Sequence, residues 1–327
     1  MTDPDSVLEG ALDLHAHGSP EFTLSMPGRV SYVEWAQLAA SARMRGFVIK
    51  SHVFPTVGVA NALAPLFPTL GIFGSITLNP PAGGLSPLAV ELAIEAGAKV
   101  VWMPTWSARE ESPHENIFTK RMEPYLSSLD AEHWPTRGLT VVDERGELLP
   151  EVDQILAICA TRGVAVATGH LPIEHSLKLC RRSRELGGSF VLTHPLSNSV
   201  SASIEQQLAI VAEGGMIEHV FIGCMPMHQR IDPRRIVEAI EAVGAEHCVL
   251  SSDAIEAWNP PEPEILRMFI ATMLGLGVPD EQVRLMTHDN PARVLGLEAD
   301  WAIPSVLNAR HDLGTLSEQV LTHTART

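Results

Sequence analysis

Four short apolar runs in the sequence end in histidine or aspartate, and these polar residues are the ones that could do chemistry. The runs end at His15 and His17, at His170, at His194 and at Asp253. Imidazole nitrogens and carboxylate oxygens are common ligands of divalent metals. Alternate residues of a strand share a face, so His15 and His17 could bind one ion. Together these residues predict a metal centre with nitrogen and oxygen ligands.

The elements that must position these residues alternate between strand and helix. Eight short runs have the composition of buried parallel strands, and each from the second onward follows a glycine that could end a helix. The runs cover residues 11–15, 47–52, 72–79, 99–105, 164–170, 190–195, 215–220 and 247–253. The clearest helical patterns cover residues 31–45, with Ser31 as N-cap, 57–66 and 87–96.

Repeated strand–helix alternation requires a parallel sheet, and right-handed crossovers curl eight such units into a closed barrel. We therefore predict an α/β fold, a TIM-like (β/α)8 barrel. An open doubly wound sheet is the alternative, but no Gly-x-Gly-x-x-Gly follows the first strand. In a barrel of this kind, polar residues at the carboxyl ends of the strands face the mouth, where loops build active sites.

The chain is expected to form a single domain over residues 1–327, with the barrel at about 11–295. One irregular segment, 105–150, is inserted between the fourth and fifth strands. Within it, residues 139–149 have the pattern of a small hairpin, and the part before them is expected to act as a lid or specificity loop. Periodicity fades after residue 295, and the extension 296–327 is expected to pack outside the barrel or against a partner.

The composition excludes several classes of protein. A content of 45% hydrophobic and 19% charged residues is typical of a globular protein, and a net charge of −16 argues against a nucleic-acid partner. No apolar run is long enough to span a membrane, and the first residues lack the features of a signal peptide. The four cysteines are widely spaced, which favours reduced thiols and a cytoplasmic location.

The order of the candidate ligands resembles the amidohydrolase superfamily of metal-dependent hydrolases. In that superfamily His-x-His follows strand one of a β/α barrel, a histidine follows strands five and six, and an aspartate follows strand eight. The matching residues here are His15, His17, His170, His194 and Asp253, and Asp289-Asn290-Pro291-Ala292 resembles a segment that often follows the barrel. The resemblance implies one or two divalent metal ions, zinc foremost with manganese or iron as alternatives, and a small-molecule substrate. We also expect a homo-oligomer.

The sequence departs from this pattern at the bridging ligand. Binuclear members use a carboxylated lysine or a glutamate, usually after strand four, and strand four here ends without a lysine or an acid. Lys50 follows strand two instead, with His52 two residues on. It could be a carboxylated bridge in an unusual place, an electrophile that faces an anionic substrate, or a salt-bridged lysine at the rim. A single-metal site of His15, His17, His170 and Asp253, with His194 behind them, is an equal alternative.

Several further residues are candidates for supporting roles. Glu174, four residues after His170, could orient a ligand, bind the metal or offset a helix dipole. Glu218 is an acid inside an apolar strand, so it needs a partner. Arg109, Trp102 and Trp106 could recognise the substrate from the lid, or simply pack on the surface.

The proposed chemistry is hydrolysis of an amide, cyclic amide or imide, or of an ester or lactone, by a metal-activated water. Asp253 would act as general base, and His194 would stabilise the developing oxyanion. Three alternatives remain open: a non-oxidative decarboxylase, a phosphoesterase and a non-catalytic metal-binding protein. The Asp-His usual after strand two in the phosphoesterases is missing here, and the intact Asp253 counts against a non-catalytic protein.

Overall fold

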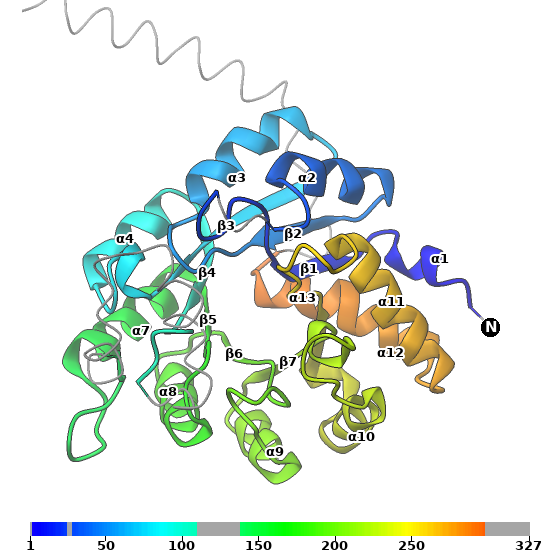
Figure 1. Cartoon of the computed structure of the whole chain (residues 1–327). Helices are drawn as coiled ribbons and strands as arrows, with labels where there is room; N and C mark the ends of the chain where they lie inside the picture. Colours follow the sequence, from blue (N-terminus) through cyan, green and yellow to red (C-terminus); the bar gives the residue numbers. More distant parts are fainter. Residues whose placement is uncertain (1, 25–27, 110–137, 298–327) are drawn as a thin grey trace, which may run out of the picture.

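The computed structural model describes residues 2–24, 28–109 and 138–297, and these form a barrel of eight parallel strands (Figure 1). The strands are β1 (Leu12–Ala16), β2 (Gly46–Ile49), β3 (Gly71–Thr77), β4 (Ala98–Trp102), β5 (Ala165–Ala167), β6 (Phe190–Thr193), β7 (Met216–Val220) and β8 (Cys248–Ser251). Each strand pairs with the next in the order of the chain. β8 is joined to β1 at the rim, where the N–H of Asp253 donates to the carbonyl of His15 at 2.9 Å. The predicted (β/α)8 barrel is therefore confirmed.

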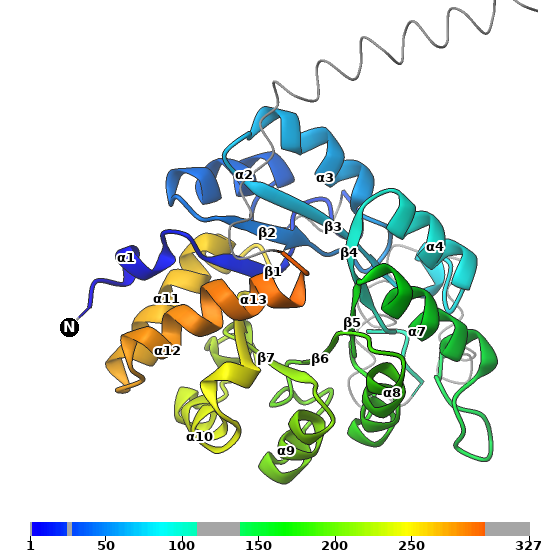
Figure 2. The same ribbon diagram turned by 180° about the vertical axis from the view of Figure 1, so that it is seen from behind.

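Helices surround the strands on the outside of the barrel (Figures 1 and 2). They are α1 (Pro4–Leu8), α2 (Tyr32–Ser41), α3 (Val57–Leu63), α4 (Pro87–Glu95), α7 (Pro150–Arg162), α8 (Ile173–Glu185), α9 (Ile204–Ala212), α10 (Pro233–Val243), α11 (Glu262–Gly275), α12 (Asp280–Arg284) and α13 (Asn290–Val294). Short turns of 3-10 helix lie at Ala64–Leu66, Pro80–Ala82, Ile222–Cys224 and Ala245–His247, and a π-helical turn spans Leu285–Asp289. Ser31 caps α2 as predicted, in a reciprocal capping box with Glu34.

The apolar residues form two layers, one between strands and helices and one inside the barrel. The interior cluster takes a residue or two from most strands, among them Leu14, Val48, Val100, Val191 and Val249, all buried. Such layers make the barrel a packed core rather than a pore. Because the interior is filled below, the polar strand ends meet only at the mouth.

An irregularity in β1 turns its histidine toward the barrel axis. The register between β1 and β2 shifts between Asp13 and Ala16. Leu14 belongs to the interior cluster, and yet its neighbour His15 also contacts interior side chains, with its ring 4.5 Å from that of Trp102. Adjacent residues of a regular strand would face opposite sides, so the shift re-aims His15.

The segments outside the regular barrel are described in part. The predicted hairpin contains one antiparallel bridge, Val142 to Leu148, closed by a turn in which the N–H of Gly146 donates to Asp143 O at 3.0 Å. The rest of the expected lid, residues 110–137, lies outside the described residues, as does the extension beyond 297. In the described ranges, no helix is both long and apolar enough to cross a membrane.

Candidate metal centre

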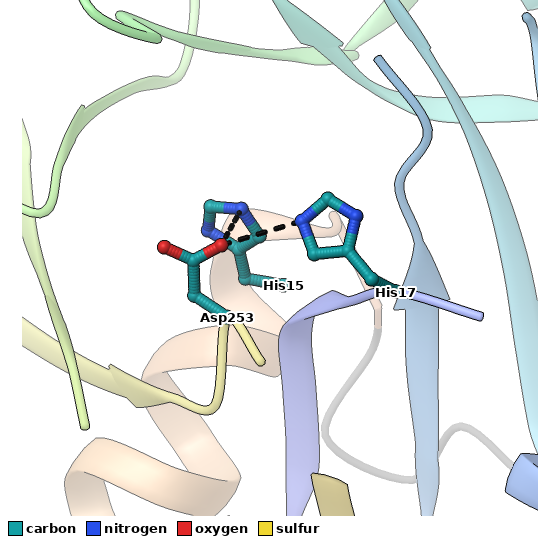
Figure 3. Close-up of side chains that lie close together, drawn as sticks. All are labelled: His15, His17 and Asp253. Carbon is teal, nitrogen blue, oxygen red and sulfur yellow. Dashed lines mark ion pairs between the residues drawn. The ribbon is translucent and has the colours of Figure 1, made fainter. Parts of the chain in front are cut away.

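Three side chains meet at the mouth of the barrel where β8 adjoins β1 (Figure 3). Asp253 Oδ1 lies 2.8 Å from His15 Nε2 and 3.3 Å from His17 Nε2. Both rings therefore face the same carboxylate oxygen of Asp253. The two histidines are buried and the Asp253 side chain is 17% exposed, so the carboxylate is the member of the group that solvent reaches.

Two buried glutamates lie behind the two histidines. Glu218 Oε2, on β7, is 3.2 Å from His15 Nδ1, and neither side chain is exposed. Glu21 Oε2, in the loop after β1, is 3.6 Å from His17 Nδ1. A carboxylate at the outer nitrogen fixes the tautomer and orientation of a metal-binding histidine. Each histidine of the pair thus has an orienting acid of its own.

The histidine–carboxylate contacts are the observation that tests whether a divalent cation fits. A neutral imidazole carries one N–H, yet His15 faces Glu218 at one nitrogen and Asp253 at the other. One of these contacts therefore requires a cation, which can be a second proton, the ammonium of Lys50 or a metal. Two imidazoles and a carboxylate with ligand atoms within 4.8 Å of one another form a donor set suited to zinc, manganese or iron. The residues fit the metal.

Lys50 reaches the same group from the end of β2. Its Nζ lies 2.8 Å from His15 Nε2 and 4.7 Å from the centre of the Trp102 ring, and it is 1% exposed. Burial lowers the pKa of Lys50, although the charges of Asp253, Glu218 and Glu21 act in the opposite direction. An ammonium and a metal ion would compete for the lone pair of His15 Nε2, so metal binding there requires the amine to move or to change its form.

His170 and His194 lie beside this group and face each other. Their ring centroids are 4.9 Å apart, and that of His194 is 6.2 Å from that of His15. Burial lowers the pKa of both histidines to about 3. The charge of Lys50 lowers the pKa of His170 further, and the charge of His170 does the same for His194. Both are therefore neutral, which is the form of histidine that binds metal.

The backbone is left-handed at three of the strand ends. Gly169, before His170, has φ of 60°, and His194 and Asp253 have φ of 30° and 54°. A Cβ on Gly169 would meet the carbonyl oxygen of Met103 at 2.4 Å, so only glycine fits there. Non-glycine residues with positive φ are uncommon and cluster at functional sites.

The protonation of the carboxylates suits a cation site. Burial alone would raise the pKa of Asp253, but His15, His17 and Lys50 hold it well below its usual value. Burial also opposes ionisation of Glu21, yet hydrogen bonds from His17 and His52 lower its pKa to about 2. Both acids are thus ionised at neutral pH and supply negative charge next to the imidazoles.

Glu21 also holds His52, the histidine at the end of β2. Its Oε1 lies 2.6 Å from His52 Nδ1. The His52 ring stacks on that of His17, with centroids 4.9 Å apart and planes 3° from parallel. It also stacks on the ring of Trp106, with centroids 4.5 Å apart. Glu21, His17 and His52 form a second compact group of possible ligands. Since His17 already faces Asp253, we assign Glu21 an orienting role.

A pocket opens above these residues. Its lining includes His17, His52, Trp106, His170, His194 and Asp253, together with further residues of the loops after β6, β7 and β8. Its cavity volume is about 80 Å³. The predicted ligands and one predicted substrate residue, Trp106, therefore share one hollow.

Three other predicted site residues lie elsewhere. Trp102 is 1% exposed and packs beneath His15 inside the barrel, rather than on a lid. Arg109 borders a different hollow, and its Nε donates to the carbonyl of Gly138 at 3.2 Å. Glu174 is exposed in the first turn of α8, the position of a carboxylate that offsets a helix dipole.

Sequence reasoning missed Glu21 and the buried His219, which also lines the pocket. Glu21 lies four residues after His17 in a loop, so no periodic pattern marks it. An acid so close to a His-x-His pair is the only signal that could have found it. His219 follows Glu218 directly in a strand, so strict alternation would predict that it points away from the barrel interior. For this reason the sequence did not mark it as a pocket residue.

Comparison with known proteins gives a family. The sequence pattern of a Family of unknown function (DUF6282) matches residues 10–218, more than half of the chain. The chain belongs to this family. In this DUF6282 protein the matched region includes His15, His17, His170, His194 and Glu218 and ends before Asp253. No curated protein matches the sequence.

Solved structures similar to this DUF6282 protein are amidohydrolase-superfamily barrels. An amidohydrolase from Pseudomonas aeruginosa has a TM-score of 0.60 at 14% identity, over 90% of this chain and 98% of that one. A probable 2-pyrone-4,6-dicarboxylic acid hydrolase from Acinetobacter baumannii has 0.55 at 12%, over 88% and 100%. A 2,6-dihydroxybenzoate decarboxylase from Rhizobium has 0.50 at 10%, over 88% and 99%. At these identities the likeness establishes the fold.

Proposed function

We propose that this protein is a metal-dependent hydrolase of a small molecule. The observation that carries the proposal is that His15 and His17 both face one carboxylate oxygen of Asp253 at the barrel mouth. The orienting acids behind both histidines and the pocket above them support it. We expect one ion, zinc first, with His170 as a further ligand and His194 beside it.

A divalent cation bound there would supply Lewis acidity, which polarises a scissile carbonyl and acidifies water. Asp253, whose carboxylate is ionised and partly exposed, would accept a proton from the attacking water and deliver it to the leaving group. His194 has its Nδ1 2.8 Å from Ser197 Oγ, which orients the ring, so its other nitrogen could donate to the developing oxyanion.

These roles suit cleavage of a carbonyl compound. We propose an amide, cyclic amide or imide bond first, and an ester or lactone bond second. Each of these reactions passes through a tetrahedral oxyanion, which one cation and one neutral histidine can stabilise together.

Metal analysis followed by a substrate panel tests the proposal. Protein from zinc-, manganese- or iron-supplemented growth should carry about one equivalent of metal and hydrolyse at least one amide, imide, ester or lactone. Replacement of His15 and His17 together by alanine should remove both the metal and the activity. The circular dichroism spectrum is recorded alongside, because both histidines are buried and the loss of metal and activity must be measured on a folded protein.

A serine variant of the half-buried His247, which lies at the opposite end of β8, provides a control for histidine loss away from the site. Less than a tenth of an equivalent of metal in the wild type would refute the proposal. So would full metal content and activity in the double variant.

A further inference from the structure

Besides the metal ligands, a group of aliphatic residues lines the pocket, and we call it the aliphatic wall. It consists of Leu196 after β6, Val220 and Ile222 at the end of β7, Ile231 and Ile236 before and in α10, and Ile255 after β8. The polar Ser197, Ser199, His228 and Gln229 also line the pocket. Val220, Ile222 and Ile236 are buried, and the other three wall residues are half-buried. The wall is therefore already packed from behind and offers its apolar face to whatever enters.

Two contacts hold this wall in place. The N–H of Ile231 donates to the carbonyl of Gly223 at 2.9 Å. A Cβ on Gly223 would lie 2.8 Å from the Cδ1 of Ile231, so the isoleucine side chain packs directly on the glycine backbone. A preformed apolar surface of this kind favours an apolar ligand group, because no reorganisation is needed on binding.

The charged groups in the pocket are acids. Asp253 and Glu256 line it, and none of its described lining residues is a lysine or an arginine. Glu256 Oε2 accepts from Asn259 Nδ2 at 2.9 Å. Lys50 lies below the pocket, with its amine against His15. A carboxylate on the substrate's remote end would thus lose hydration beside two acids, with no lysine or arginine among the described lining residues to offset that cost.

From these observations we propose that the substrate is an amide, imide, ester or lactone whose remote end is an apolar chain or ring without a carboxylate. This group lies on the aliphatic wall and directs the carbonyl toward His15, His17 and Asp253. The inference rests on the proposed hydrolase function and adds the class of substrate.

Matched compounds that differ only at the remote end test it. Hexanamide ends in a methyl group and adipamic acid in a carboxylate, and methyl hexanoate and monomethyl adipate form the corresponding ester pair. In the metal-loaded enzyme kcat/KM should favour the methyl-terminated member by at least about 100-fold.

Calorimetry supplies a readout that does not need turnover. Hexanohydroxamic acid and the monohydroxamate of adipic acid share one metal-binding group, so the ratio of their dissociation constants reports the remote end alone. The hexanoyl compound should bind at least tenfold more tightly to the metal-loaded protein. Ile231→Arg or Leu196→Arg should shift this ratio toward the carboxylated compound, whereas Ile231→Leu and Leu196→Met should keep the wild-type preference.

The outcomes separate the two proposals. Tighter binding or faster turnover of a charged member by the wild type would overturn the substrate class and leave the hydrolase function intact. An unchanged hydroxamate ratio in both folded arginine variants would also overturn it. Metal binding and hydroxamate preference without turnover of any amide or ester would instead refute the hydrolase function alone.

Discussion

Replacement of Glu218 by glutamine should weaken metal binding while the barrel stays folded. Glu218 Oε2 lies 3.2 Å from His15 Nδ1, and neither side chain is exposed. The carboxylate keeps the imidazole proton on Nδ1, so the lone pair of Nε2 is directed toward Asp253 and the pocket. Glutamine has the same size and retains an acceptor oxygen, so the substitution removes the negative charge and little else.

The size of the effect follows from burial. Loss of an acid behind a metal-binding histidine typically costs 10- to 100-fold in metal affinity. Screening by solvent is weakest for a fully buried pair, and this pair has no exposure, which places the expected loss near the upper value, about 100-fold. That factor corresponds to about 2.7 kcal/mol of binding free energy. Glu21→Gln should have a smaller effect on affinity, because Glu21 Oε2 is 3.6 Å from His17.

Chelator competition measures this loss. Wild type and variant are titrated against a chelator of known affinity, and protein-bound metal is determined after removal of the chelator complex. Glu174→Gln is the matched control, since Glu174 is an exposed acid at the start of α8 and should leave affinity unchanged. A dissociation constant for Glu218→Gln within about threefold of wild type, in a protein with an unchanged circular dichroism spectrum, would show that Glu218 does not tune a metal ligand.

Three further substitutions probe the other acids and the lysine. Asp253→Asn should retain most of the metal but lower kcat by at least about 100-fold, the usual worth of a positioned base, and near-normal turnover would exclude this aspartate as the base. Lys50→Ala should leave the metal content at one equivalent, because an ammonium is not a ligand, whereas a fall from two equivalents to one by metal analysis would identify a carboxylated bridge. Burial holds the pKa of Glu262 well above its usual 4.5, so as the pH rises above 4.5 the unfolded chain loses this proton first and the wild type loses stability. Glu262→Gln should therefore become more stable than wild type, by up to about 1.4 kcal/mol per pH unit, in urea unfolding from pH 4.5 upward; parallel stability curves would contradict this.

The strands of the barrel were predictable because their burial has a simple signature. Each run that the sequence marks as apolar and β-branched overlaps the corresponding strand, from Leu12–Ala16 to Cys248–Ser251. Six of the strands end two or three residues before the predicted limits, whereas β1 ends one residue after its limit and β7 ends at it. Pairing stops where the polar residues begin, since His170, His194 and Asp253 leave the sheet to face the mouth.

The types of the site residues were predictable from the sequence, whereas the directions in which their side chains point were less so. The sequence places His15 and His17 at one strand end and Asp253 at another, and barrel closure brings these ends together. Trp102 shows the limit of this reasoning, because the same strand-end position can point into the core as well as into a pocket. Loop residues such as Glu21 have no periodicity, so only the folded chain shows what they touch.

The closure of the barrel and the geometry of the ligands depend on the same contact. Asp253 has a φ of 54°, a conformation that costs about 1–3 kcal/mol for a residue other than glycine. Its N–H donates to the carbonyl of His15 at 2.9 Å, which joins β8 to β1. Its side chain then turns back so that Oδ1 lies 2.8 Å from the imidazole of the same histidine. One residue thus connects the first and last strands through its backbone and sets the spacing of two candidate ligands through its side chain. The strained backbone of Asp253 is retained because both the closure of the barrel and the geometry of the site depend on it.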